Sequence, residues 1–349
     1  MKILALADFD PAGVVLSHRD ALRACCPDID FRVALHTAYT PRQRGADWVG
    51  ASLQGCDAQG REFYAPGGGD LPALLEFAYS ADVIQIHPGI GQPWADQPEH
   101  FLPERDPPVA PYFGRKDWPE IIGGSRARHL VAFFHGSVHA RANIEGYRQR
   151  YAGLHFAAST LDYAVDLDAA YLPPALPLPA VAAPLRADDD PLIVAHTPTN
   201  PSIASTEIFL AAARAAGVVV NYASRRSHEE ALAAKQRSHM TFDHLRGTFS
   251  VNSLEAASLG SIPLVALAES GRVRGHVEGL WGNAPPWPQL QPGLEGERAL
   301  PKLLRTLADD YGFPGATRTG QELVRAWFTE HFTPAPIAAR LERFYRGLR

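Results

Sequence analysis

Cysteine and long apolar runs are scarce in this chain, and each scarcity excludes a class of protein. The 349 residues include three cysteines, too few for a disulfide framework and without metal-ligand spacing. No apolar run approaches the ~20 residues of a membrane-spanning helix. The first apolar run ends at Asp8, which is too early for a signal peptide. We therefore expect a cytoplasmic protein without a transmembrane segment.

An excess of basic charge is also lacking. The chain has 33 Lys and Arg against 38 Asp and Glu, a net charge of −5 at pH 7 with neutral histidines. This balance does not favour nucleic acid or an anionic membrane as the main partner. An apolar fraction of 46% and a charged fraction of 20% are ordinary for a globular protein. The length exceeds that at which single cores usually divide, which predicts two domains.

In the first half of the chain, short apolar runs alternate with helical patterns. Strands are expected at 2–7, 31–36, 82–87, 129–135 and 153–159, and helices at 13–25, 70–79 and 139–150. Because these runs are apolar throughout, they predict a parallel sheet covered on both faces. The stretches 37–69 and 88–118 are expected to be loops.

A proline-rich stretch, 171–191, interrupts the pattern and predicts a boundary without a packed element. The alternation then restarts. Further strands are expected at 192–196, 217–223 and 262–267, and helices at 204–216, 227–236, 297–311, 317–331 and 335–348. The predicted fold class is α/β, with two doubly wound Rossmann-like domains facing each other across a cleft. Their expected ranges are 1–178 and 191–334, with a linker at 179–190 and a C-terminal helix, 335–349, packing back on the first domain.

The segment "GTFSVNSLEAASLGSIPLV" (247–265) places one acid in a helix of small residues. We expect this helix to begin near Ser253 and to stop at Gly260. Its N-terminal amides, those of residues 251–253, form a potential anion site. Glu255 has two interpretations: an acid favoured by the helix dipole, or an acceptor for vicinal hydroxyls such as those of a ribose.

Residues 243–267 resemble the nucleotide-sugar-binding segment of GT-B glycosyltransferases, especially glycosyltransferase family 4. Four stretches that precede this segment also resemble that family and occur in the family's order. They are "ADVIQIH" (81–87), "FFHGSVHAR" (133–141), "ASTLDYAVDLDAAYLPPALP" (158–177) and "VAHTPTN" (194–200). The resemblance implies a GT-B fold and a hexosyltransferase-like enzyme, retaining and metal-independent. It would transfer a sugar from a nucleotide diphosphate sugar, with UDP favoured, to an acceptor hydroxyl on the first domain. No cofactor, metal site or dedicated base is expected.

The resemblance also assigns roles to residues. Glu255 would hold the ribose, the amides of Asn252 and Ser253 the diphosphate, and His135 would face the transferred sugar. His135 could instead be a polar strand end satisfied by the backbone. Gly13 would let the backbone approach the diphosphate and the acceptor closely, or it could belong to an ordinary strand-to-helix turn. The expected catalytic residues are His135, Arg225 and Arg226. The expected nucleotide-sugar residues are Gly13, Thr197, Thr199, Arg225, Gly247, Ser250, Val251, Asn252, Ser253 and Glu255.

The chain departs from the family pattern in the residues that would contact the sugar and the phosphate. Gly247 stands eight residues before Glu255, where the family usually has a glutamate, although Asp243 with Gly247 fits a D-x-x-x-G version. Ala204 stands where the family has lysine. Cations matter because negative charge builds on the departing phosphate, and losing one such donor costs roughly 10²–10³ in rate. The candidate substitutes are Arg225, Arg226, Arg272, Arg274 and Arg141, whereas Lys235, in mid-helix, is expected at the surface.

Two alternatives stay open. Ala204 and Gly247 favour a catalytically inactive GT-B module that binds a nucleotide or a glycan. The arginines of 103–150 favour a phage-type DNA glycosyltransferase that acts on a hydroxymethylated base. The sequence leaves open the donor sugar, the acceptor (a glycan, a small molecule or a modified base) and a homodimer.

Overall fold

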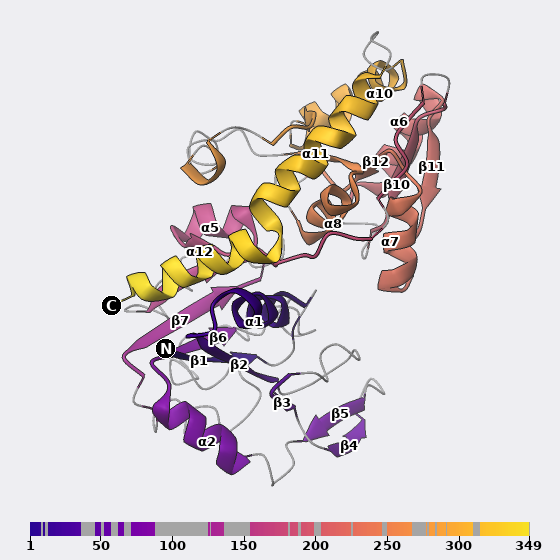
Figure 1. The fold of residues 1–349 in the computed structure, drawn as a ribbon. Coiled ribbons are helices and arrows are strands. Elements are labelled where there is room, and N and C mark those ends of the chain that lie inside the picture. The colour runs from indigo at the N-terminus through magenta and orange to yellow at the C-terminus, as the bar shows by residue number, and fades with distance from the viewer. Residues whose placement is uncertain are drawn as a thin grey trace. The chain divides into compact units, whose positions relative to one another are not determined.

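The structure, a computed structural model, describes most of the chain. It describes residues 1–7, 10, 13–35, 46–49, 52–56, 62–65, 71–87, 125, 127–135, 154–180, 182–187, 190–198, 204–224, 226–245, 250–266, 277, 279–282, 285–290, 292–309 and 315–348. The chain forms two compact units (Figure 1). Unit 1 contains Met1–Ala175 and Pro334–Arg349, and unit 2 contains Leu176–Thr333.

Unit 1 is built on a parallel sheet. Its described strands are β1 (Lys2–Ala7), β2 (Asp30–Leu35), β3 (Trp48–Val49), β6 (Val83–His87), β7 (His129–Phe134), β8 (His155–Ala158) and β9 (Ala170–Tyr171), in the order β3-β2-β1-β6-β7-β8-β9. The interior strand β1, "KILALA", is buried at every position after Lys2. Such a strand must have both faces covered, as its unbroken apolar sequence predicts.

Four described helices accompany this sheet. They are α1 (Val14–Cys25), α2 (Leu71–Ser80), α5 (Leu161–Leu167) and α12 (Pro334–Gly347). The C-terminal helix α12 packs against α1, in the same unit (Figure 1). Ile337, Leu341 and Tyr345 are fully buried and recur at helical spacing, so one face of α12 belongs to the core of unit 1.

Unit 2 repeats the plan with a shorter parallel sheet. Its described strands are β10 (Ile193–His196), β11 (Val219–Tyr222), β12 (Met240–Phe242), β13 (Ile262–Ala266) and β14 (Gln289–Leu290), in the order β11-β10-β12-β13-β14. The unit also contains the helices α6 (Thr206–Ala216), α7 (His228–Gln236), α8 (Val251–Leu259), α10 (Leu294–Ala308) and α11 (Ala316–Phe332). The prediction of an α/β fold with two parallel sheets is confirmed.

Some expectations about single elements were wrong. The stretch 37–69 is not only loop: it contains β3 and an antiparallel hairpin of β4 (Ser52–Cys56) and β5 (Glu62–Ala65). Trp48 of β3 is buried and packs against Phe77 of α2, so tertiary packing fixes this short strand. The three-residue strand β12 was not predicted. The predicted helix 139–150 and loop 88–118 lie outside the described residues.

Several residues of the proline-rich stretch 171–191 are buried. It contains no helix in its described part, but the Arg186 side chain is 6% exposed. Its guanidinium donates to the carbonyl oxygens of Leu307 (2.8 Å) and Ala308 (2.6 Å). These are the last carbonyls of α10, where a cation also complements the helix dipole. An arginine therefore anchors this stretch to unit 2.

Candidate functional site

Helix α8 of unit 2 begins at Val251, two residues before the expected start. Ser250 is its N-cap, and its hydroxyl oxygen accepts a hydrogen bond from the amide of Asn252 (3.1 Å). Gly260 ends the helix in a left-handed conformation (φ 80°), which confirms the predicted stop. The helix directly precedes β13 and packs against α7 and α11.

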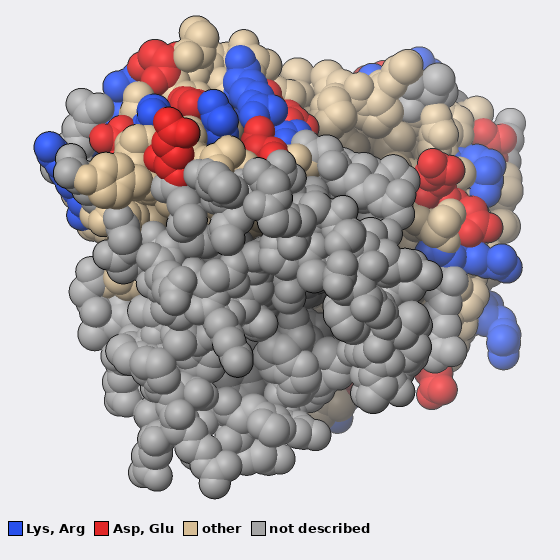
Figure 2. Space-filling model, turned by 90° about the horizontal axis from the view of Figure 1, so that it is seen from below, with Lys and Arg blue, Asp and Glu red and all other residues tan. Residues whose placement is uncertain are grey.

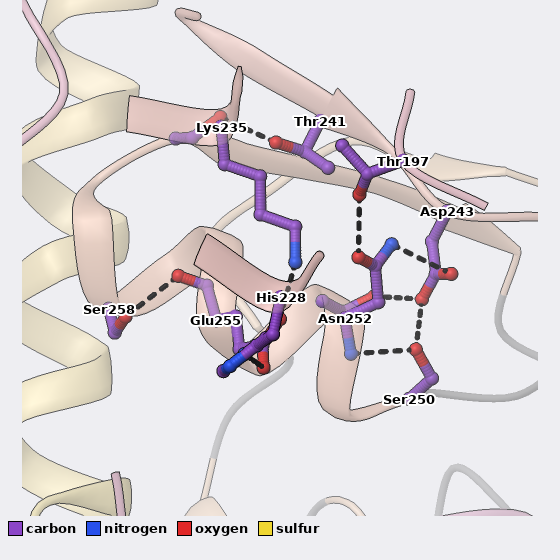
Figure 3. Close-up of polar contacts among 11 residues, drawn as sticks. Thr197, His228, Lys235, Thr241, Asp243, Ser250, Asn252, Glu255 and Ser258 are labelled. Atoms are coloured by element: carbon purple, nitrogen blue, oxygen red, sulfur yellow. Dashed lines mark hydrogen bonds and ion pairs between the residues drawn. The ribbon is translucent and has the colours of Figure 1, made fainter. Parts of the chain in front are cut away.

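Asp243, which directly follows β12, lies at the start of α8 and is 7% exposed. Its carboxylate accepts hydrogen bonds from Ser253 Oγ (2.7 Å), Asn252 Nδ2 (3.1 Å) and Ser250 Oγ (Figure 3). Burial alone would raise the pKa of this carboxyl, but the charge of His244 and these hydrogen bonds outweigh burial and lower it. The first turn of α8 therefore already holds one anion, and that anion belongs to the chain.

The predicted diphosphate residues of unit 2 are thus brought together around Asp243. The Thr197 hydroxyl donates to the Asn252 side-chain oxygen (3.0 Å), which joins the end of β10 to this cluster (Figure 3). The side chains of Ser250, Asn252 and Ser253 donate to the Asp243 carboxylate. The backbone amide of Asn252 donates to the Ser250 hydroxyl oxygen. Contact of these residues with a diphosphate stays a prediction.

Glu255, one turn further along α8, is held by two hydrogen-bond donors from α7. Its Oε1 accepts from His228 Nε2 (2.7 Å) and its Oε2 from Lys235 Nζ (2.5 Å) (Figure 3). The Lys235 side chain is 1% exposed and that of Glu255 14%, so the expectation of a surface lysine was wrong. His228 and Lys235 are seven residues apart in α7, which puts both on the helix face toward α8.

The two partners also govern the ionisation of Glu255. Burial alone would raise the pKa of this carboxyl, but the charge of Lys235 and the hydrogen bonds from His228 and Lys235 lower it. Sequence reasoning missed both partners. The available signal was their common helix face, opposite the single acid of a helix made of small residues.

Of the cations predicted to face the phosphate, Arg226 is among the described residues. Arg226, just before α7, is exposed and lies 3.8 Å from Glu230 of α7. The remaining candidates, Arg225, Arg272, Arg274 and Arg141, lie outside the described residues, as do Thr199 and Gly247.

His196, at the end of β10, is a neutral group. Its Nδ1 donates to the carbonyl oxygen of Phe242 (3.1 Å), so its Nε2 accepts from the Thr206 hydroxyl (2.8 Å). Burial lowers its pKa to about 4. Ala204, where the family has lysine, is followed by Ser205, the N-cap of α6, in a left-handed conformation (φ 54°). Because His196 is neutral, it does not replace the positive charge of the lysine that the family has at position 204.

In unit 1, His135 belongs to a buried chain of hydrogen bonds. Tyr345 donates to Gln85 Oε1 (2.5 Å), and Gln85 Nε2 donates to His87 Nε2 (2.7 Å). His87 must then carry its proton on Nδ1 and donate to His135 Nε2 (2.8 Å). His135 Nδ1 in turn donates to Ser159 Oγ (3.3 Å). A tyrosine on α12 thus fixes the tautomers of two histidines at the ends of β6 and β7.

Both histidines of this chain are uncharged. Burial, together with the charge of His18, lowers the pKa of His135 to about 3, and burial holds that of His87 well below its ordinary value. His135 is 7% exposed, and both of its ring nitrogens are used by side chains rather than by the backbone. A role for His135 beside the transferred sugar stays a prediction.

Gly13 precedes α1 and requires glycine, because its φ is 67°. Its amide donates to the carbonyl oxygen of Asp10 (3.2 Å). The Asp10 carboxylate accepts from the amides of Val15 and Leu16 (both 3.0 Å) and is fully buried. Sequence reasoning missed this cap, although an acid three residues before a glycine turn is typical of helix starts. As at α8, a carboxylate of the chain occupies a helix N-terminus.

Three properties of the described residues bear on possible partners: surface charge, metal-binding groups and membrane-spanning helices. On the described part of the face in Figure 2, Lys and Arg side chains lie among Asp and Glu side chains. Among the described residues, no three His, Cys, Asp or Glu side chains form a group that could hold a metal ion. None of the helices in the described part of the chain has the length and hydropathy needed to span a bilayer.

Comparisons with known proteins identify the fold. No protein-family model matches the chain, and no curated protein does. Among solved structures, the chain is similar to the apo form of the lipopolysaccharide outer core galactosyltransferase WaaB (TM-score 0.56, 10% identity, all of both chains covered). It is also similar to an alpha-glucosyltransferase in complex with UDP and a 13-mer DNA (TM-score 0.55, 10% identity, 100% and 99% covered).

A third similar structure is the N-terminal domain of Candida albicans trehalose-6-phosphate phosphatase (TM-score 0.54, 10% identity, 99% and 96% covered). At such identities the comparisons establish the fold and not the activity. The chain has the GT-B fold, as its motifs predicted. Its placement in glycosyltransferase family 4 stays a prediction.

Proposed function

We propose that this protein is a glycosyltransferase that moves a sugar from a nucleotide diphosphate sugar, with UDP favoured, to an acceptor hydroxyl. Unit 2 binds the nucleotide sugar and unit 1 the acceptor, and the reaction is retaining and metal-independent. The observation that carries the proposal is Glu255, an ionised carboxylate on α8, the helix directly before β13, in a chain with the GT-B fold.

The geometry of Glu255 suits a ribose. An ionised carboxylate has roughly four lone-pair positions, two on each oxygen. His228 and Lys235 use one position on each oxygen, which leaves one on each for the two vicinal hydroxyls of a ribose. In open α/β sheets, ligands bind outside the carboxyl ends of the strands, and α8 begins at that edge, close to the end of β12.

The proposed reaction breaks the bond between the anomeric carbon and the phosphate oxygen. A bond from the acceptor oxygen to that carbon forms on the same face, and the hydroxyl proton passes to the departing phosphate. Because negative charge grows on that phosphate, arginines must face it. Arg225 and Arg226, directly before α7, are the proposed source, since Asp10 and Asp243 already occupy the N-termini of α1 and α8.

A thermal-shift screen with UDP, GDP, ADP, CDP and dTDP tests the nucleotide site. A ligand at 100 times its dissociation constant adds about 2.7 kcal/mol to the free energy of unfolding. One diphosphate should raise the melting temperature of the native protein and of a Glu229→Ala control, whose substituted side chain is exposed on α7. The rise should be lost in Glu255→Ala. No rise with any diphosphate would contradict the proposal.

A second candidate function is binding without transfer. Two cationic side chains in the described part of unit 2 are already paired with carboxylates of the chain: Arg226 with Glu230, and Lys235 with Glu255. The chain is also similar to a domain of a protein named as a phosphatase. If the screen finds a ligand, incubation with the matching nucleotide sugar distinguishes the two functions, because only a transferase releases the nucleoside diphosphate in the presence of acceptor.

A modified base in DNA is one acceptor class to include in those assays. One similar structure holds UDP and DNA, and Arg128, in the arginine-rich region, is exposed. DNA binding through such arginines would weaken steeply with salt, in proportion to the number of phosphates contacted. Binding without salt dependence, or no binding, would exclude this acceptor class.

A further inference from the structure

We propose that Lys235 is a positioning residue of the nucleotide site: it fixes the Glu255 carboxylate in the orientation that accepts the ribose hydroxyls. The inference rests on the proposed function and extends it to a residue outside the motif that carries the resemblance.

The contact between the two side chains is short and shielded from water. Lys235 Nζ lies 2.5 Å from Glu255 Oε2, and the Lys235 side chain is 1% exposed. It extends from the last turn of α7 to the first turns of α8 (Figure 3). A buried lysine without an acidic partner would lose most of its hydration, so this one is stable only in the pair. Its ammonium therefore holds the carboxylate in place.

The pair also has an electrostatic role toward a nucleotide. A lone carboxylate beside the ribose would repel the diphosphate a few ångströms away, in a region of low dielectric where that repulsion is strong. With Lys235 the pair is neutral overall, yet Glu255 keeps the acceptor capacity of an ionised group. A glutamine would also be neutral, but one side of its amide would present donors to the diol.

No other described element supplies an equivalent charge next to Glu255. From α7, His228 donates to Oε1. From α11, Arg325 and Glu322 lie beside Gly260, at the far end of α8. Strand β13 has only apolar residues, and Asp243, after β12, is engaged with the cap of α8. The protonation of Glu255 is therefore governed by α7.

The experiment compares dissociation constants for UDP and 2′-deoxy-UDP, and for the GDP and ADP pairs, at pH 7.5 and pH 5.5. The proteins are the native chain, Lys235→Met, Lys235→Arg and a control, Lys302→Met, which removes an exposed lysine of α10. We expect the native chain to prefer the ribonucleotide at both pH values. The Lys235→Met variant should bind the ribonucleotide at least about tenfold more weakly. It lacks the charge-assisted hydrogen bond from Lys235 that holds the Glu255 carboxylate in place. It should also lose the preference over the deoxy form.

The pH dependence and the rescue distinguish positioning from a general structural effect. Without Lys235, burial raises the pKa of Glu255, so the carboxylate gains a proton as the pH falls and ribonucleotide binding weakens from pH 7.5 to 5.5. The native chain and Lys302→Met should show no such change. Lys235→Arg, which keeps the charge, should restore most of the preference. Circular dichroism establishes that each variant is folded.

A double-mutant cycle with Glu255→Gln covers the case in which Lys235→Met alone is too unstable, because Lys235→Met/Glu255→Gln removes both charges together. If Lys235 acts through Glu255, adding Lys235→Met to Glu255→Gln leaves the dissociation constant unchanged. An equal loss in both backgrounds, or a Lys235→Met protein that binds like the native chain, would overturn the inference while nucleotide binding stands. Failure of the native chain to bind any of the nucleotides would overturn the proposed function and the inference together.

Discussion

The buried polar groups at the carboxyl edges of the two sheets differ in charge: they are neutral at the ends of β6 and β7 in unit 1 and ionised around α8 in unit 2. In unit 1, the strands β6 and β7 end in His87 and His135, both buried and neutral. In unit 2, the edge around α8 carries two carboxylates, Asp243 and Glu255, both ionised because donors surround them. Similar parallel sheets can therefore present either a closed, uncharged network or fixed charges at the edge where ligands bind.

This difference has a chemical consequence. The hydrogen-bond chain from Tyr345 to Ser159 uses both nitrogens of each histidine, so in this structure neither histidine has a nitrogen lone pair to offer a substrate. Glu255 retains acceptor positions after its two bonds. The contrast assigns the nucleotide to unit 2 in our proposal, and it can be broken or sharpened by experiment.

The largest expected effect comes from acid. In the folded protein His18 and His135 have pKa values of about 4 and 3, below the ordinary 6.5, so below pH 6.5 the unfolded chain binds more protons. Stability from these groups is full above pH 6.5 and is lost as the pH falls. Each shifted pKa unit corresponds to about 1.4 kcal/mol, so unit 1 should lose about 4 kcal/mol between pH 7 and pH 5.

Among the described histidines of unit 2, burial lowers the pKa of His196 to about 4 and also lowers that of His239. Unit 2 should still lose less than unit 1, where His87 is affected in addition to His18 and His135. Urea unfolding followed by hydrogen exchange of peptides from each unit measures the two losses separately. Equal losses in the two units would contradict the view that unit 1 is the edge of buried neutral histidines.

The second effect concerns the ion pair of unit 2. Lys235→Met leaves Glu255 largely buried with only His228, so unit 2 should lose about 3 kcal/mol of unfolding free energy. Adding Glu255→Gln should recover most of that loss. Urea titration at pH 7.5 measures both, and Lys302→Met is the exposed control. A loss below about 0.5 kcal/mol would mean that the pair does not hold in solution.

The third effect concerns the anion at the start of α8. Asp243→Ala removes the acceptor for three side chains, including the fully buried Ser253, and should cost about 2 kcal/mol. Asp243→Asn keeps an acceptor oxygen and should cost less. Thermal unfolding of the two variants gives the comparison, and an Asp243→Ala protein as stable as Asp243→Asn would argue against the cluster.

The smallest effect is expected at the far end of the histidine chain. Tyr345→Phe removes the donor to Gln85 Oε1 and should cost about 1 kcal/mol. The two histidines would also lose the constraint on their tautomers, which nitrogen-15 NMR of the imidazoles reports. Unchanged tautomers in Tyr345→Phe would show that the order does not depend on Tyr345.

The two-sheet plan could be predicted because its main strands are unbroken apolar runs. The runs at 2–7 and 262–267 match β1 and β13 to within a residue. Strand β12 could not be found this way, since three residues show no pattern and its identity comes from pairing with β10 and β13. Periodicity likewise missed β3, which depends on packing of Trp48 against another element.

The candidate site was predictable only where one segment contains its parts. Glu255 and the Gly260 stop lie five residues apart in one segment, and motif reasoning named both, whereas it placed the helix start near Ser253 and missed Ser250 as the cap. Lys235 was missed because its partner is 20 residues away on another helix, and a mid-helix lysine is most often exposed. Arg186 was missed for the same reason, since its partners are the carbonyls of α10.

Hydrogen–deuterium exchange with and without a saturating nucleoside diphosphate tests the central claim most directly. The account predicts slower exchange in α8 (Val251–Leu259) and in the first turn of α7, with no change at the ends of β6 and β7. Protection confined to those ends of unit 1, or no protection with any of the five diphosphates, would contradict the assignment of the nucleotide to Glu255.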